Sequence, residues 1–153
     1  MRVLVDTGVW SLALRRTDGY LHPETEELLR LVMAHVAEII GPVRQEILSA
    51  VRDRPHFARL ENHLDAFPDV PLLSEDFVTA AKFFNLCRPQ GIQGSNIDFL
   101  LCAVAVRCDL AIFKTDGDFR HFAKCLPIAL CEFKKTGEFP SLRPRRSSSK
   151  QRK

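Results

Sequence analysis

The chain has 153 residues, of which 46% are hydrophobic and 27% are charged, and these values fit one globular domain. No apolar run approaches the ~20 residues of a membrane-spanning helix, and no secretory signal is recognisable, so we expect a cytoplasmic protein that does not contact membranes. The five cysteines form no Cys-x-x-Cys pair, which argues against a zinc site or a disulfide framework.

Charge is distributed unevenly along the chain. The formal net charge is +3, but residues 141–153 carry six Lys or Arg and no acid, so the rest of the chain has a formal charge of −3. We expect one folded domain over residues 1–133, followed by a basic, disordered tail over residues 134–153. This tail is either a solvated end or a loose arm that binds phosphates.

Segments typical of strands and helices alternate along the chain. In chain order we expect a strand at 2–5, helices at 9–15 and 23–34, a strand at 36–40, helices at 42–52 and 55–67, a strand at 70–73, helices at 74–88 and 95–108, a strand at 110–113, a helix at 119–125 and a strand at 128–133. This alternation predicts an α/β fold, with a mostly parallel sheet of about five strands covered by helices on both faces.

Acidic residues follow two of the predicted strands. The first strand ends at Asp6 and the fourth ends shortly before Asp116, so both carboxylates are expected at the same edge of a parallel sheet, where ligands bind. Two further acids lie on helices. Glu46 flanks the apolar face of helix 42–52, and Asp98 lies in the first turn of a helix that is apolar almost all round.

Each acid also has a purely structural explanation. Asp6 could cap the first helix, and Asp98 could complete a capping box with the serine three residues before it. Glu46 could be a solvated helix residue, while Asp116 and Asp118 could be turn and cap residues.

A cluster of these acids would need cations. Two unit charges ~4 Å apart repel by about 4 kcal/mol at an effective dielectric constant of ~20, and a cluster contains several such pairs. Carboxylate-rich sites suit Mg²⁺ or Mn²⁺, and such ions activate water and stabilise the leaving oxygen in phosphodiester hydrolysis. The sequence therefore favours phosphoryl or phosphodiester chemistry.

Four segments together resemble the PIN-domain nucleases, and more narrowly the VapC-like toxins of type II toxin–antitoxin systems. They are Val-Asp-Thr-Gly-Val-Trp at 5–10, Pro-Val-x-x-Glu at 42–46, Ile-Asp-Phe-Leu-Leu-Cys-Ala-Val-Ala at 97–105 and Thr-Asp-Gly-Asp-Phe at 115–119. The resemblance implies a three-layer α/β/α sandwich and a magnesium-dependent endoribonuclease. It also implies an RNA substrate, a cognate antitoxin and a homodimer.

The resemblance also implies roles for individual residues. The metal ligands would be Asp6, Asp98 and Asp116, with Asp118 as a weaker ligand, while Glu46 would be a ligand or a base that orients the attacking water. Thr7 would support the first aspartate, and Lys114 would hold a substrate phosphate. Two positions depart from the family pattern: Gly8 stands where many relatives have Ser or Asn, and Lys114 stands where they often have Thr.

Two other functions remain open from the sequence. A PIN-like module without catalysis would bind RNA or a protein, and a small metal-dependent phosphatase would use the same sheet edge. The first strand reads Asp-Thr-Gly rather than the Asp-x-Asp usual in such phosphatases.

Overall fold

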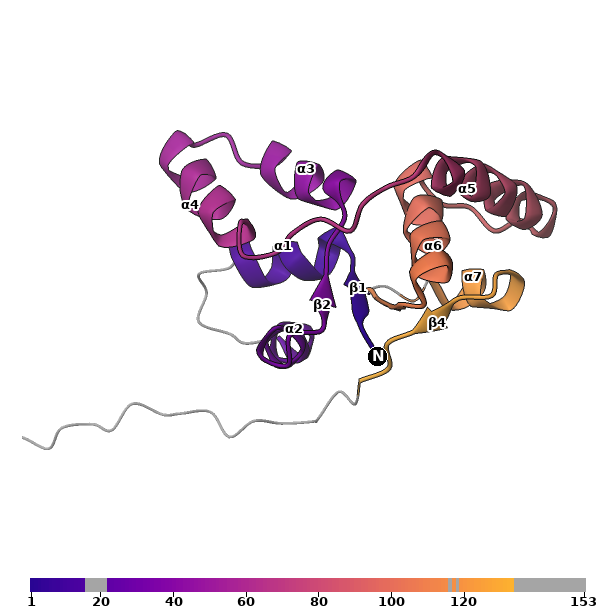
Figure 1. Cartoon of the computed structure of the whole chain (residues 1–153), viewed down its shortest axis with the longest axis horizontal. Helices are drawn as coiled ribbons and strands as arrows, with labels where there is room; N and C mark the ends of the chain where they lie inside the picture. Colours follow the sequence, from indigo (N-terminus) through magenta and orange to yellow (C-terminus); the bar gives the residue numbers. More distant parts are fainter. Residues whose placement is uncertain (16–21, 116, 118, 134–153) are drawn as a thin grey trace, which may run out of the picture.

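The computed structural model describes residues 1–15, 22–115, 117 and 119–133, and Figure 1 shows their arrangement. The elements in chain order are β1 (Val3–Val5), α1 (Thr7–Arg15), α2 (Pro23–Met33), β2 (Ala37–Glu38), α3 (Gly41–Ser49), α4 (Arg54–Leu64), α5 (Ser74–Cys87), a 3₁₀ turn η1 (Arg88–Gln90), α6 (Asn96–Cys108), β3 (Ala111–Phe113), α7 (Phe119–Cys125) and β4 (Ala129–Leu130). The predicted helices are all present, with ends that differ by a few residues.

The strands form a parallel sheet in the order β2-β1-β3-β4. The first strand of the chain is central, because Val3 pairs with Ala37 of β2 on one side and with Ala111 of β3 on the other. The fold class is therefore as predicted, with four strands among the described residues where about five were expected.

The strand expected at 70–73 is not formed. Ile39 makes a single parallel bridge with Asp69, and the amide of Val70 donates to the Ile39 carbonyl at 2.8 Å. The next residue is Pro71, which has no N–H to continue a ladder, so pairing at this edge stops after one bridge.

Helices pack on both faces of the sheet and complete a three-layer sandwich. In Figure 1, α1 to α4 occupy the left half of the molecule, and α5 to α7 occupy the right half. Helix α6 is the most buried of them, since its residues 99–105 are all buried. The carboxyl ends of β1 and β3, from which the candidate site is built, lie between the two groups of helices.

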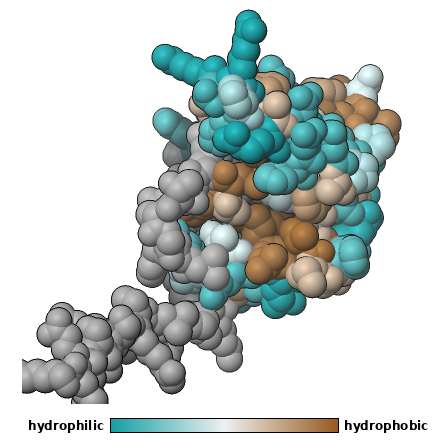
Figure 2. Space-filling view, turned by 90° about the vertical axis from the view of Figure 1, so that its left-hand side faces the viewer, coloured by the Kyte–Doolittle hydropathy of each residue, from teal (hydrophilic) through white to brown (hydrophobic). Residues whose placement is uncertain are grey.

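Several aromatic side chains lie in the core, although Phe77 is 54% exposed. Trp10 is 2% exposed and packs edge-on against Phe67. Phe83 is also buried. Hydrophobic residues nevertheless gather on the face of the molecule shown in Figure 2. Leu29 and Met33 of α2 are among the exposed large hydrophobic side chains. Among the described helices, none is long and apolar enough to cross a membrane.

Candidate active site

Asp6 lies at the carboxyl end of β1, beside the end of β3. The parallel register pairs Val5 with Phe113, and the amide of Asp6 donates to the Phe113 carbonyl at 3.0 Å. The residue after Phe113 is Lys114, so the ladder places an acid and a base on neighbouring strands. Asp116 and Asp118, the other acids predicted in this region, lie outside the described residues.

Asp98 reaches the same edge from the first turn of α6. Its two carboxylate oxygens have different partners: Oδ2 accepts from the Ser95 amide at 2.8 Å, and Oδ1 accepts from Lys114 Nζ at 2.9 Å. The Ser95 hydroxyl in turn accepts from the Asp98 amide at 3.1 Å, which completes a capping box. The structural and the functional explanations of Asp98 are therefore compatible, because each uses a different oxygen.

Lys114 lies between the two acids. Its Nζ is 2.9 Å from Asp98 Oδ1 and 3.8 Å from Asp6 Oδ2, and it lies 4.3 Å from the centre of the Phe119 ring. The Lys114 side chain is only 13% exposed. Two carboxylates therefore share one cation, and a buried aromatic face gives that cation a third favourable contact.

The two carboxyl groups respond differently to this environment. Burial raises the pKa of Asp6, and the opposing effects of Lys114 and of the Thr7 and Gly8 amides do not cancel it. Burial also acts to raise the pKa of Asp98, but its hydrogen bonds from Lys114 and Ser95 outweigh burial and hold that pKa below its usual value. Asp98 is thus the better-compensated anion, and Asp6 is the carboxylate in greater need of positive charge.

Glu46 joins the site through Thr7. The Thr7 hydroxyl donates to Glu46 Oε2, so it ties the first turn of α1 to α3. Both residues line an open groove of about 610 Å³, whose other walls are Ser11, Pro42, Gln45, Ser49, Ala50 and Ile97. Because Asp6 precedes Thr7 and Asp98 follows Ile97, this groove borders the two acids.

Gly8 makes room for Thr115. A Cβ atom at Gly8 would lie 3.1 Å from Thr115 Oγ1 and 3.7 Å from Asp6 Oδ2. A hydroxyl from the segment after β3 thus approaches the backbone at the position where a side chain of residue 8 would begin. This contact was not predictable from the sequence, because it depends on the register between β1 and β3.

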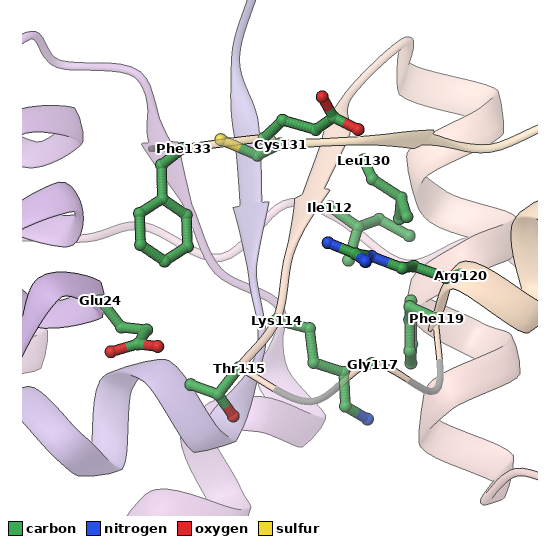
Figure 3. A pocket seen from close by; sticks show the side chains of 11 residues that line it. Glu24, Ile112, Lys114, Thr115, Gly117, Phe119, Arg120, Leu130, Cys131 and Phe133 are labelled. Carbon is green, nitrogen blue, oxygen red and sulfur yellow. The ribbon is translucent and has the colours of Figure 1, made fainter. Parts of the chain in front are cut away.

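A second hollow lies on the other side of the site (Figure 3). Its volume is about 460 Å³, and its walls are Glu24, Ile112, Lys114, Thr115, Gly117, Phe119, Arg120, Leu130, Cys131, Glu132 and Phe133. Glu24 approaches it from α2, opposite Phe119 and Arg120. Although Glu24 is only 9% exposed, sequence reasoning missed it, because three acids near the start of α2 equally suit a helix N-terminus.

Asp6, Asp98 and Lys114 therefore form one cluster, with Glu46 connected to its edge. Among the described residues no three His, Cys, Asp or Glu side chains come close enough together to form a complete metal site. Two carboxylates are nonetheless a common protein contribution to Mg²⁺, which keeps several waters and also takes substrate phosphate oxygens. The donor chemistry at Asp6 and Asp98 fits such an ion.

Comparisons with known proteins agree with this architecture. A family model described as "PIN domain" matches residues 3–124. The fold resembles FitAcB from Neisseria gonorrhoeae, with a TM-score of 0.67 and 16% identity over 85% of this chain and 96% of that one. It also resembles VapBC2 from Rickettsia felis bound to a promoter DNA fragment, with a TM-score of 0.66 and 13% identity over 88% of this chain and all of that one. VapBC-1 from nontypeable Haemophilus influenzae is similar, at a TM-score of 0.65 and 10% identity over 86% and 98% of the two chains. A comparison with curated proteins finds no match.

Proposed function

We infer the function from one premise: this chain belongs to the PIN domain family, whose model matches most of its length. We propose that it is a magnesium-dependent endoribonuclease and the toxin of a toxin–antitoxin pair. The observation that carries the proposal is that the Asp6 and Asp98 carboxylates converge on one cation position at the carboxyl end of a parallel sheet.

In this proposal Asp6 and Asp98 hold Mg²⁺, or Mn²⁺ in its place, and Asp116 and Asp118 add further oxygens from the chain after β3. When bound, the ion supplies a more acidic water and a counter-charge for the leaving oxygen. Glu46 accepts a proton or orients the attacking water from the groove, and Thr7 fixes the Glu46 carboxylate through its hydroxyl. Arg120, exposed at the neighbouring hollow, attracts the RNA backbone.

Replacing either central acid by its amide tests this assignment. Asp6→Asn and Asp98→Asn are expected to lower the rate of RNA cleavage with Mg²⁺ by on the order of 100-fold or more, since each removes one anion from the site. Asn at 98 still offers an oxygen to the Ser95 amide, so α6 keeps its cap. Glu75→Gln on α5 is the matched control, and cleavage that persists undiminished in both site variants would contradict the proposal.

We further propose an antitoxin partner and a homodimer. The structures that this fold resembles include VapBC and FitAB assemblies, two of them bound to DNA fragments. An open reading frame beside this one, co-expressed with it, is expected to relieve its toxicity and to co-purify with it. Light scattering of the chain alone is expected to give twice the 17.4 kDa chain mass. If no neighbouring gene product relieves the toxicity, the antitoxin proposal is wrong. If light scattering gives the mass of a monomer, the homodimer proposal is wrong.

The position of Lys114 favours a second function, a PIN-like module that binds RNA or protein without cleaving it. Its ammonium already neutralises Asp6 and Asp98 in part, so the fold does not depend on a metal for charge balance. Isothermal titration with Mn²⁺ separates the two functions, because a module that only binds has no use for the ion.

A further inference from the structure

Lys114 is held in place by several contacts rather than extended into solvent. The Asp98 carboxylate accepts a hydrogen bond from Lys114 Nζ at 2.9 Å, the Asp6 carboxylate lies 3.8 Å away, and the Phe119 ring lies beneath the ammonium at 4.3 Å. Phe119 is itself buried, at 2% exposure. The side chain of a surface lysine normally extends into solvent and does not turn inward onto two carboxylates and an aromatic ring.

The ammonium and a divalent ion need the same oxygens. Magnesium ligands lie at about 2.0–2.1 Å from the ion, so an ion on Asp98 Oδ1 would stand within a few ångströms of an ammonium hydrogen-bonded to that atom. The two cations would repel strongly at such a distance in a partly buried site. The other oxygen of Asp98 already accepts a hydrogen bond from the Ser95 amide, so Oδ1, the oxygen bonded to Lys114, is the one without a backbone partner.

We propose that Lys114 is a tethered counter-ion that competes with the divalent metal for Asp6 and Asp98, and that its ammonium leaves this position when the metal binds. The proposal rests on the proposed function, because it assumes that these two acids bind a metal. It assigns to Lys114 a control of metal affinity, which differs from holding a substrate phosphate.

The structure offers a place to which the side chain can move. Lys114 is one of the walls of the 460 Å³ hollow shown in Figure 3, and its four-carbon chain is flexible. Rotation away from Asp98 would bring the ammonium into this hollow, which opens to solvent and also contains the carboxylate-bearing Glu24 and Glu132. Without metal, the Lys114 ammonium then offsets part of the charge of Asp6 and Asp98. With metal bound, the ammonium is solvated in the hollow.

Metal affinity, rather than activity, tests the proposal. Lys114→Met removes the ammonium and keeps the length of the side chain, and its dissociation constant for Mn²⁺, measured by isothermal titration, is expected to be at least about tenfold lower than that of the wild type. Lys82→Met, an exposed lysine on α5, is the matched control and should leave the constant unchanged. The double variant Lys114→Met/Asp98→Asn should lose the gain, because it lacks one ligand.

A second measurement uses the wild-type protein and does not depend on a variant that folds. Acetylation of lysines, followed by mass spectrometry, is expected to modify Lys114 several-fold faster with saturating Mn²⁺ than with a chelator, while Lys82 reacts at the same rate in both conditions.

If Lys114→Met is unstable in chelator, Lys114→Gln replaces it in the titration, because the amide retains an N–H for Asp98.

The outcomes separate this proposal from the proposed function. Wild-type protein that binds Mn²⁺ and cleaves RNA, with unchanged affinity in Lys114→Met and unchanged labelling of Lys114, overturns the counter-ion role alone. Absence of Mn²⁺ binding in the wild type and in every variant overturns both. Tighter binding by Lys114→Met together with faster labelling of Lys114 supports the proposal.

Discussion

At the scale of single residues, the candidate site is a compromise between charge and burial. Asp6 is 7% exposed and carries a raised pKa, so the fold disfavours its ionised form. Asp98 lies nearby with a lowered pKa, because its cap and Lys114 compensate its charge. Ionised Asp6 therefore lowers the stability of the folded protein, while ionised Asp98 raises it, although both carboxylates face the Lys114 ammonium.

Stability against pH should report this cost at Asp6. Because the folded pKa is raised, the folded protein retains a proton that the unfolded chain releases, and stability falls as pH rises from 3.8 through the folded pKa. In chelator at pH 7, Asp6→Asn is therefore expected to be more stable than the wild type, because it removes a charge that burial disfavours. Urea unfolding measures this gain, which should vanish below pH 3.8. A variant less stable than the wild type at pH 7 would contradict the expectation.

Gly8 and Thr115 should be energetically coupled. Gly8→Ala places a methyl group 3.1 Å from the Thr115 hydroxyl, which must move to accommodate it. Thr115→Ala removes that hydroxyl, so the cost of Gly8→Ala should be smaller in the Thr115→Ala background, with a coupling energy of about 0.5 kcal/mol or more. Denaturant unfolding of the four proteins in the cycle measures the coupling. Additive effects would show that the two positions do not touch.

At the scale of elements, α5 and α6 are joined by an ion pair between the buried Asp76 and the exposed Arg107. Asp76 is 1% exposed, and its carboxylate accepts from Arg107 at 2.6 and 2.9 Å and from the Leu73 amide at 2.8 Å. Burial acts to raise the pKa of Asp76, but these hydrogen bonds outweigh it and leave the pKa lowered. The pair holds α6, the helix that carries Asp98, against α5. Arg107 lies near the end of α6, whereas Asp98 lies in its first turn.

Removing the Asp76 charge should destabilise the protein at neutral pH. Asp76→Asn removes the charge that accepts two hydrogen bonds from Arg107, and a loss of about 1.5–3 kcal/mol is expected, as for hydrogen bonds to charged groups. Because the folded pKa is lowered, this stability is present above 3.8 and is lost as pH falls through the folded pKa, so the difference between variant and wild type should shrink in acid. Urea unfolding at pH 7 and pH 3 checks both statements, and Glu75→Gln, on the same turn, is the control.

Gly94 lets the start of α6 approach α7. A Cβ atom there would lie only 2.5 Å from Phe122 Cζ, and Phe122 packs between Phe99 and Phe119 at centroid distances of 5.1 and 4.8 Å. Gly94→Ala is therefore expected to cost about 1–3 kcal/mol, the usual range for overpacking. Thermal unfolding measures the cost, which Phe122→Leu in the same chain should reduce. Unchanged stability would mean that the loop around Gly94 shifts to accommodate the added methyl group.

The helices were predictable because residues close to each helix start indicate where it begins. Proline opens α2, and the Ser95–Asp98 capping box opens α6, as the sequence indicated. The prediction of a strand at 70–73 was wrong, since whether Pro71 ends pairing depends on which sheet edge the segment meets, and the sequence pattern does not show this. The inward turn of Lys114 was likewise beyond the sequence, because it follows from the register of β3 beside β1 and the position of Asp98 across the edge.

At the scale of the whole molecule, charge is divided between the folded domain and the residues after it. Residues 141–153 carry six positive charges, and the rest of the chain has a formal charge of −3. The division into a PIN-like domain at 1–133 and a tail at 134–153 remains a prediction, since the tail lies outside the described residues. Under the proposed function, an acidic domain needs positive charge from another part of the chain to hold an RNA backbone.

Deleting residues 141–153 should therefore weaken RNA binding without altering the fold. The loss of six cations is expected to raise the dissociation constant at low salt and to reduce the slope of its logarithm against that of the salt concentration. Binding to a labelled single strand over a salt series measures both quantities, and a variant with the six residues changed to Gln controls for length. Equal slopes for full-length and truncated protein would assign the tail no contact with phosphates.

The central position of β1 has a consequence for the newborn chain. Asp98 and Lys114 follow Asp6 roughly 100 residues later in the chain, a delay of about 5 to 20 s at ordinary speeds of synthesis. Until β3 emerges from the ribosome, β1 has a partner on one side only and the acids are apart. The cluster of Asp6, Asp98 and Lys114 therefore assembles only after most of the domain has been made.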